Sequence, residues 1–327
     1  MIIDFSAHII PLDVGKILAK KPYYGSIGEG GKYQFLYPPE NADPKHRLEI
    51  MEKFRVDMQL LSPTSPILLG FDKKDALKIA RLSNDYISDL CSKYPDKFIG
   101  CALISLLDVE SALEELDRTI KDLGFKCVTI STNQNGRGLD SEDYYPFYER
   151  VAKYDIPIFL HPTHWENYPL IDMERGWRFL HIFGWPFDTT QAVWRLIFGG
   201  VLDKFPTLKI VTHHLGGMLP YYSCRLVTGI ESIQSLLKVK LNRHIETYFE
   251  QIYGDTALDG GPLGALICGY AFFGSNRMLF GSDYPFGPPE RFIGENIAGI
   301  KAMPISKEEK EKILGKNAAK LLKLKYA

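Results

Sequence analysis

Short apolar runs alternate with helix-like patterns from one end of the 327-residue chain to the other. The runs are hydrophobic at successive positions, which is typical of parallel strands that helices cover on both faces. The predicted strands are 2–6, 57–61, 98–104, 126–130, 157–161, 208–213, 249–254 and 278–282. The predicted helices that follow them are 44–54, 73–94, 109–123, 144–154, 189–203, 217–238, 260–272 and 306–323. Strand–helix pairs in this order predict an α/β fold of the (β/α)8, or TIM, barrel type.

The helix over 109–123 has the clearest pattern, because its apolar residues recur at helical spacing. Ser306 followed by Glu309 predicts a capping box at the start of the last helix. An open doubly wound sheet is the alternative, but it predicts a glycine-rich turn after the first strand, where the chain has Ser-Ala-His. The glycines of 25–33 fit neither a phosphate-binding loop nor a dinucleotide fingerprint, and we interpret them as a flexible turn.

Two segments are longer than ordinary loops. Residues 12–43, between the first strand and its helix, are rich in Gly, Pro and Tyr, and we expect a small insertion over the barrel mouth. Residues 162–188 follow the fifth strand and contain Trp165, Trp177 and Trp185. No linker, repeat or low-complexity tract divides the chain, so we expect a single domain over 1–327.

Composition and charge narrow the class of protein. The chain is 45% hydrophobic and 24% charged, which is ordinary for a globular enzyme, and its formal net charge is -1. This balance gives no indication of nucleic-acid or membrane binding, and no apolar stretch reaches the ~18 residues of a membrane span. The N-terminus has no signal-like pattern and none of the five cysteines forms a Cys-x-x-Cys pair. We therefore expect a cytoplasmic protein with small buried cysteines.

Metal-type ligands stand where predicted strands end, at His8, His161, His214 and Asp283. Because the carboxyl ends of barrel strands meet at one rim, we expect these side chains to converge on one site. Alternation along the first strand places Asp4, Ser6 and His8 on one face, and we expect all three to point into the barrel.

His213 and His214 are adjacent, so on a regular strand only one of them faces inward, and we choose His214. Two imidazoles, one carboxylate and a further His suit a divalent first-row ion, zinc first, with manganese or magnesium as alternatives. The free imidazole would suit proton transfer.

Four more residues are candidates for binding a substrate. Arg47, at the start of the first barrel helix, and Arg225, eleven residues beyond His214, could each hold a carboxylate. His164 and Trp165 lie just past His161 and could shape the pocket. A Ser-His-Asp hydrolase is disfavoured, because the chain has no Gly-x-Ser-x-Gly elbow.

The chain resembles the amidohydrolase superfamily, in its decarboxylase-rich branch. Within that branch it is most similar to the aminocarboxymuconate-semialdehyde decarboxylases, with the γ-resorcylate type as close alternatives. The resemblance extends over nearly the whole chain and rests on DFSAHIIP, HRLEIMEKFRVDMQLLSPTSP, FLHP, GGVLDKFPTLKIVTHHLGGMLPYYSCR and MLFGSDYPFG. The segment from Gly199 to Arg225 is the most specific, because spacing and residue types both match.

The resemblance implies a distorted barrel whose only cofactor is a divalent metal held by the strand-1 pair, His161 and Asp283. It implies that His214 is the proton-handling residue beside the metal-bound water. It further implies that Arg47 and Arg225 grip the carboxylates of a small-molecule substrate, Arg225 from the partner subunit of a homodimer.

Ser6 departs from this family pattern, which has His at the position, or Glu in the resorcylate type. His8, His161 and Asp283 remain, and three protein ligands suffice for a catalytic zinc. The leading hypothesis is a metal-dependent, non-oxidative decarboxylase of an unsaturated or aromatic carboxylic acid. In this hypothesis, His214 or Asp283 delivers the proton to the carbon that loses CO2. A metal-dependent hydrolase or hydratase of a lactone, amide or diacid is the second. A metal-free binding protein on a degenerate barrel is the third, and Ser6 is its only support.

Overall fold

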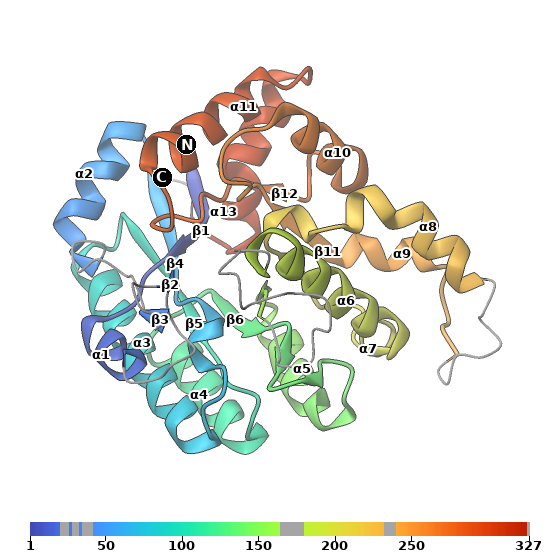
Figure 1. Ribbon diagram of the computed structural model, residues 1–327, viewed down its shortest axis with the longest axis horizontal. Coiled ribbons are helices and arrows are strands. Elements are labelled where there is room, and N and C mark those ends of the chain that lie inside the picture. Colours follow the sequence, from blue (N-terminus) through green and yellow to red (C-terminus); the bar gives the residue numbers. More distant parts are fainter. Residues whose placement is uncertain (20–25, 28–32, 35–41, 164–179, 232–239, 326–327) are drawn as a thin grey trace.

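Eight parallel strands form the central sheet of the computed structural model, which describes residues 1–19, 26–27, 33–34, 42–163, 180–231 and 240–325. Their spatial order is β1-β4-β5-β6-β9-β10-β11-β12, and each strand pairs with its neighbour in sequence order. The strands are β1 Ile3–His8, β4 Met58–Ser62, β5 Phe98–Leu103, β6 Cys127–Ser131, β9 Ile158–His161, β10 Ile210–Thr212, β11 Ile252–Asp255 and β12 Met278–Leu279. All of the predicted strands are therefore confirmed, and the fold is the expected (β/α)8 barrel (Figure 1).

The barrel closes between β1 and the segment that follows β12. The backbone N–H of Phe5 donates to the carbonyl of Phe280 at 2.8 Å, and that of His8 donates to Tyr284 at 2.7 Å. Between them the N–H of Asp283 donates to the carbonyl of Ser6 at 2.9 Å. The first strand and the last loop of the barrel are thus held in register beside each other.

The helices surround this barrel (Figure 1). The larger ones are α2 Pro44–Phe54, α3 Lys73–Lys93, α4 Val109–Lys121, α5 Tyr145–Tyr154, α6 Trp185–Phe198, α8 Leu219–Glu231 and α10 Leu263–Phe273. Asp43, Asp72 and Asp108 cap the amino ends of the first three, each carboxylate accepting a backbone N–H of the first turn.

The remaining helices are short. They are α1 Leu12–Leu18, α7 Val201–Lys204, α9 Ile245–Tyr248, α11 Asn296–Ala302, α12 Lys307–Glu311 and α13 Asn317–Leu321. Gly200, at φ 76°, separates α6 from α7, so the predicted helix 189–203 is broken there. The predicted capping box is confirmed at α12, where Ser306 and Glu309 bond to each other's backbone.

Residues 12–43, where an insertion over the barrel mouth is expected, are partly described. The first part of this segment is α1, whose Val14 and Leu18 pack with Ile79 of α3 in a buried cluster. Two short antiparallel strands, β2 Ser26–Ile27 and β3 Tyr33–Gln34, pair within it. The segment interpreted as a flexible turn at 25–33 therefore contains strand residues at both ends.

A buried cluster fills the inside of the barrel, with one or two residues from most strands. It includes Phe5 of β1, Leu60 of β4, Phe159 of β9 and Val211 of β10. Residues of α13 pack against the same cluster. Because side chains alternate along a strand, this packing also determines which residues face inward at the carboxyl ends of the strands.

Two expectations from composition can be compared with the structure. Among the described residues, no helix has the length and apolar character to cross a membrane. Cys101 and Cys127 are buried as expected, but Cys224 is exposed on α8, so the expectation of a buried cysteine is wrong there.

Candidate active site

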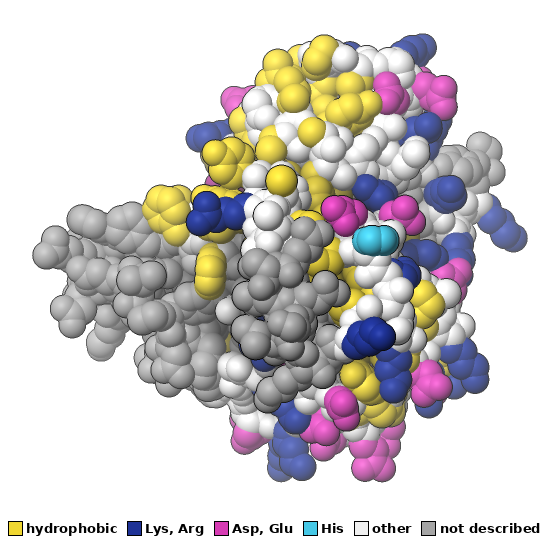
Figure 2. All heavy atoms as spheres, turned by 90° about the vertical axis from the view of Figure 1, so that its right-hand side faces the viewer, with side chains coloured by type: hydrophobic (Ala, Val, Ile, Leu, Met, Phe, Trp, Pro, Cys, Tyr) yellow, Lys and Arg dark blue, Asp and Glu magenta, His cyan; other side chains and the backbone are white. Residues whose placement is uncertain are grey.

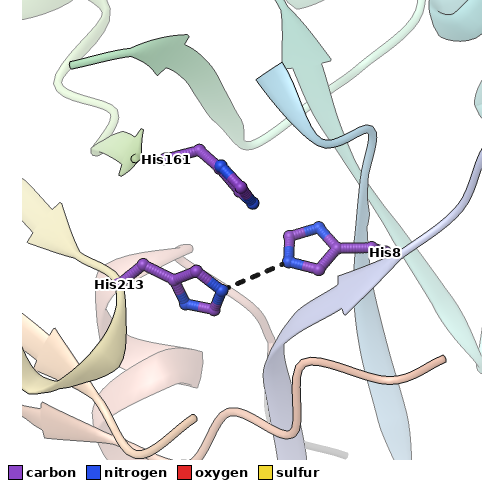
Figure 3. Close-up of side chains that lie close together, drawn as sticks. All are labelled: His8, His161 and His213. Carbon is purple, nitrogen blue, oxygen red and sulfur yellow. Dashed lines mark hydrogen bonds between the residues drawn. The ribbon is translucent and has the colours of Figure 1, made fainter. Parts of the chain in front are cut away.

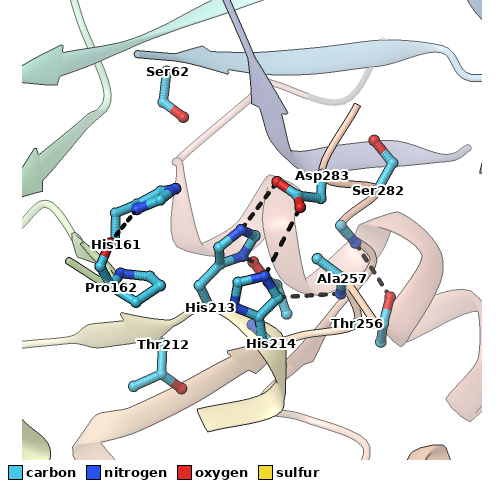
Figure 4. A network of polar contacts seen from close by, with 12 residues as sticks. Ser62, His161, Pro162, Thr212, His213, His214, Thr256, Ala257, Ser282 and Asp283 are labelled. Carbon is cyan, nitrogen blue, oxygen red and sulfur yellow. Dashed lines mark hydrogen bonds and ion pairs between the residues drawn. The ribbon is translucent and has the colours of Figure 1, made fainter. Parts of the chain in front are cut away.

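The polar strand ends meet at the carboxyl end of the barrel. His8 ends β1, His161 ends β9, His213 follows β10 directly and Asp255 ends β11. Asp283 lies in the loop after β12 (Figure 4). All five side chains are at most one tenth exposed, so their polar atoms can be satisfied only by one another or by a bound group.

His213 and His214 both reach the site, so the expectation that only one of them faces inward is wrong. Val211 packs inside the barrel, and alternation then puts His213 on the same inner face. The backbone turns left-handed directly afterwards, with φ of 54° at His214 and 49° at Leu215. This turn brings the His214 ring back to 3.8 Å from the His213 ring, centroid to centroid.

The three fully buried imidazoles are each held at Nδ1. His8 Nδ1 lies 3.3 Å from the Ser62 carbonyl and His161 Nδ1 lies 2.8 Å from the Pro162 carbonyl. A carbonyl only accepts hydrogen bonds, so Nδ1 of His161 carries the proton. His8 Nδ1 also lies 3.1 Å from the Ser62 hydroxyl, which can accept as well as donate, and the carbonyl beside it assigns the proton of His8 to Nδ1 as well. The Nε2 atoms of both rings are therefore left unprotonated, which is the form that binds a metal.

His213 is held in the same way by a carboxylate. Its Nδ1 lies 2.5 Å from Oδ2 of Asp255, whose Oδ1 accepts the backbone N–H of His214 at 2.9 Å. The three rings of His8, His161 and His213 consequently turn their Nε2 edges toward a common centre (Figure 3). Asp255 was not anticipated, although it ends an apolar run just as Asp283 does.

Asp283 completes this centre. Its Oδ1 lies 3.2 Å from Nε2 of His8. The same oxygen lies 3.2 Å from Nε2 of His213, and Oδ2 lies 3.8 Å from Nε2 of His214 (Figure 4). Its backbone is left-handed, with φ of 60°, a conformation that Asp tolerates better than most residues. The loop is thereby shaped to aim the carboxylate at the histidines.

The charges of the buried histidines and carboxylates favour the binding of a cation at this centre. Burial lowers the pKa of His8 and takes that of His161 well below its usual range, so both rings are neutral. Burial would raise the pKa of Asp283, but hydrogen bonds from His213, His214 and His8 hold it well below its usual range. Burial also lowers the pKa of His213, yet the Asp255 and Asp283 carboxylates outweigh it and raise that pKa to about 10. Two buried carboxylates thus attract a positive charge to this point.

A β-bulge in β1 corrects the expected orientation of Asp4. The pairing of β1 with β4 shifts by one residue between Asp4 and Ala7, so alternation is interrupted there. Phe5 packs inside the barrel, whereas Asp4 accepts hydrogen bonds from Gln59 Nε2 at 3.2 Å and from the Ser282 hydroxyl at 2.6 Å. Asp4 is therefore not one of the side chains that point into the site; it anchors the loop that carries Asp283.

Arg47 is buried behind the site. Its Nη2 donates to the carbonyl of His8 at 2.7 Å and its Nη1 donates to Gln59 Oε1 at 3.1 Å. The guanidinium also lies over the ring of Tyr284, 4.9 Å from its centroid. These contacts connect α2 to β1, β4 and the loop after β12.

The other expected substrate-binding residues are not brought together with the site in the described chain. Arg225 is exposed on α8, and His164 and Trp165 lie outside the described residues. The ring of Trp185 lies 5.8 Å from that of His161 and 6.2 Å from that of His214. Phe286, which is 45% exposed, lies 5.8 Å from the ring of His8. Aromatic side chains therefore border the histidines.

The chain is similar in sequence to known proteins over most of its length. The sequence pattern of the amidohydrolase family matches residues 3–324. The 2-amino-3-carboxymuconate-6-semialdehyde decarboxylase of Dictyostelium discoideum is 31% identical over 98% of this chain and 91% of its own length. The γ-resorcylate decarboxylase of a Rhizobium species is 31% identical over 85% of this chain and 86% of its own.

A solved structure extends the likeness to the fold. The dihydroxybenzoic acid decarboxylase of a Polaromonas species, crystallised with manganese and the inhibitor 2-nitroresorcinol, superposes with a TM-score of 0.81. It is 26% identical, and the match covers 100% of this chain and 98% of that one. The expected resemblance to the decarboxylase branch is thus confirmed.

Proposed function

Because the chain belongs to the amidohydrolase family, and its similar relatives are decarboxylases, we propose that it is a metal-dependent, non-oxidative decarboxylase of an aromatic or unsaturated carboxylic acid. The observation that carries the proposal is a buried set of imidazoles and one carboxylate, with the partly exposed His214 beside it. Trp185 and Phe286 at the edge of this set favour a flat, unsaturated substrate.

His8, His161 and Asp283 are the proposed metal ligands. The residues fit such an ion, because the Nε2 atoms of His8 and His161 are unprotonated and the carboxylate is ionised. Zinc suits two imidazoles and a carboxylate, and manganese is the metal bound by the Polaromonas relative. When bound, such an ion would orient the acid and stabilise negative charge.

His214 is the proposed proton donor. Decarboxylation breaks the bond between the ring or alkene carbon and the carboxyl carbon, CO2 leaves, and the electron pair stays on the remaining carbon. That carbon then takes a proton, which His214 can supply because its side chain is 16% exposed and its Nε2 lies beside Asp283. Asp283 is the alternative proton carrier.

Arg47 and Arg225 are the proposed carboxylate-binding residues, with His164 and Trp165 shaping the pocket. The contacts of Arg47 give it a second role, since it also holds the strand that carries His8. Arg225 is exposed and lies on a helix that leaves the site at His214, so it would act on the partner subunit of a homodimer.

The test is CO2 release from dihydroxybenzoates and carboxymuconate-type acids by the metal-loaded enzyme. His214→Ala should lower kcat on the order of 100-fold or more while metal content stays unchanged. In D2O the product should carry deuterium at the carbon that lost CO2. Acid formation without CO2 would favour a hydrolase instead, and unchanged kcat in the variant would remove His214 from the reaction.

A further inference from the structure

We propose that His213 is a fourth protein ligand of the metal, supplied by β10 in place of the donor that β1 lacks at Ser6. This inference rests on the metal site of the proposed function. It assigns different roles to two adjacent histidines, one binding the metal and the other delivering the proton.

The distances between donor atoms are those of ligands around a single ion. His213 Nε2 lies 3.5 Å from His8 Nε2 and 3.2 Å from Asp283 Oδ1, and the last two atoms are 3.2 Å apart. Two ligands bonded to one tetrahedral zinc at about 2.0–2.1 Å are about 3.3 Å apart. The three atoms therefore surround a point that an ion could occupy without large movements. There the ion would take the place of the Nε2 proton that the Asp255 and Asp283 carboxylates otherwise hold on His213.

His213 is also common to every possible grouping with suitable spacing in the described chain. The donor atoms of His8, His161 and His213 all lie within 4.8 Å of one another (Figure 3). Those of His213, His214 and Asp283 lie equally close together. His213 thus links the two imidazoles of β1 and β9 to the carboxylate of the last loop.

Asp255 orients His213 for this role. Its carboxylate holds Nδ1 at 2.5 Å and is itself fixed by the backbone N–H groups of His214 and Ala257. A carboxylate behind a ligating imidazole fixes the ring and strengthens its other nitrogen as a ligand. Both residues are fully buried, so contact with solvent does not account for the pairing of this imidazole with a carboxylate.

Ser6 stands at the β1 position where the family has a metal-binding side chain, and its short side chain does not supply a ligand there. Its hydroxyl is buried and has no hydrogen-bond partner among the described residues. The oxygen lies against Gly281, since a Cβ at that glycine would come within 2.2 Å of it, and beside the Asp255 side chain. The bulged strand therefore supplies only His8, and the fourth ligand that we propose, His213, comes from β10 on another part of the barrel.

Metal binding measured without turnover tests the inference. The purified enzyme, its His213→Ala variant and its His214→Ala variant would be stripped and titrated with Zn2+ against a chromophoric chelator. We expect His213→Ala to weaken Zn2+ binding on the order of 100-fold. His214→Ala, which removes the adjacent imidazole, should change it less than about threefold. The Co2+ visible spectrum should change in the first variant and not in the second.

Circular dichroism separates loss of a ligand from loss of the fold. If His213→Ala fails to fold, His213→Asn, which keeps a polar group at the position, is measured in its place. Wild-type Zn2+ affinity with an unchanged Co2+ spectrum in the His213 variant would overturn the inference. The proposed function fails separately, when the loaded enzyme releases no CO2 although its Zn2+ affinity depends on His213.

Discussion

Arg47 links the site to the elements behind it. Its guanidinium holds the carbonyl of His8 and, through Gln59, the carboxylate of Asp4, which in turn binds Ser282. Two proposed metal ligands, His8 and Asp283, are therefore positioned by one buried chain of hydrogen bonds.

Replacing Arg47 by Ala should lower the free energy of unfolding by about 3 kcal/mol, because buried acceptors lose their donor. Arg47→Lys keeps the charge but cannot reach both acceptors, so we expect an intermediate loss. Urea unfolding measures both changes. The control is Arg137→Ala, at an exposed ion pair with Asp143, where a loss of less than about 1 kcal/mol is expected. Raised KM with wild-type stability would show that Arg47 serves the substrate alone.

Individual residues also mark the limit of what the sequence could predict. His8, His161 and Asp283 were found because each follows an apolar run. The orientation of Asp4 was missed because the bulge in β1 depends on hydrogen bonds to a loop nearly 280 residues away, such as that from Asp283 to Ser6. The joint approach of His213 and His214 depends on consecutive left-handed residues, which strand periodicity cannot show.

At the scale of elements, α10 has an unusual outer face. Leu263, Ile267 and Ala271 recur every four residues and are exposed, while Leu266 and Phe273 are buried against the core. A helix that is apolar on both faces is typical of one that is covered on both. The neighbouring α8 packs beside α10 (Figure 1). It exposes Tyr221, which is 78% accessible. Figure 2 views this side, where hydrophobic side chains gather on the upper part of the face.

We expect this face of α8 and α10 to form the interface of the proposed homodimer. Ile267→Glu should convert the dimer to a monomer without unfolding it, because the side chain is 42% exposed in the single chain. Light scattering after gel filtration measures the mass. Leu12→Glu, at an equally apolar and exposed position on α1, is the matched control and should leave the mass unchanged. A wild-type monomer, or a dimer that persists in the Ile267→Glu variant, would place any interface elsewhere.

At the scale of the whole molecule, the proposed interface and the candidate active site are connected through the chain. The segment after His213 turns through His214 and continues directly into α8, so the site and the proposed interface lie on one stretch of chain. Arg225 is exposed on that helix, with Tyr221 one turn before it. On the proposed role of Arg225, dimerisation would complete the substrate site.

Mixed dimers test this dependence directly. His214→Ala and Arg225→Ala homodimers should each be poorly active, for different reasons. When the two are dissociated and reassembled together, half of the dimers pair one subunit of each kind, and one site in each such dimer has both intact residues. Activity measured below KM should then recover to about one quarter of wild type. Mixtures whose activity only equals the average of the two parents would mean that Arg225 does not act across the interface.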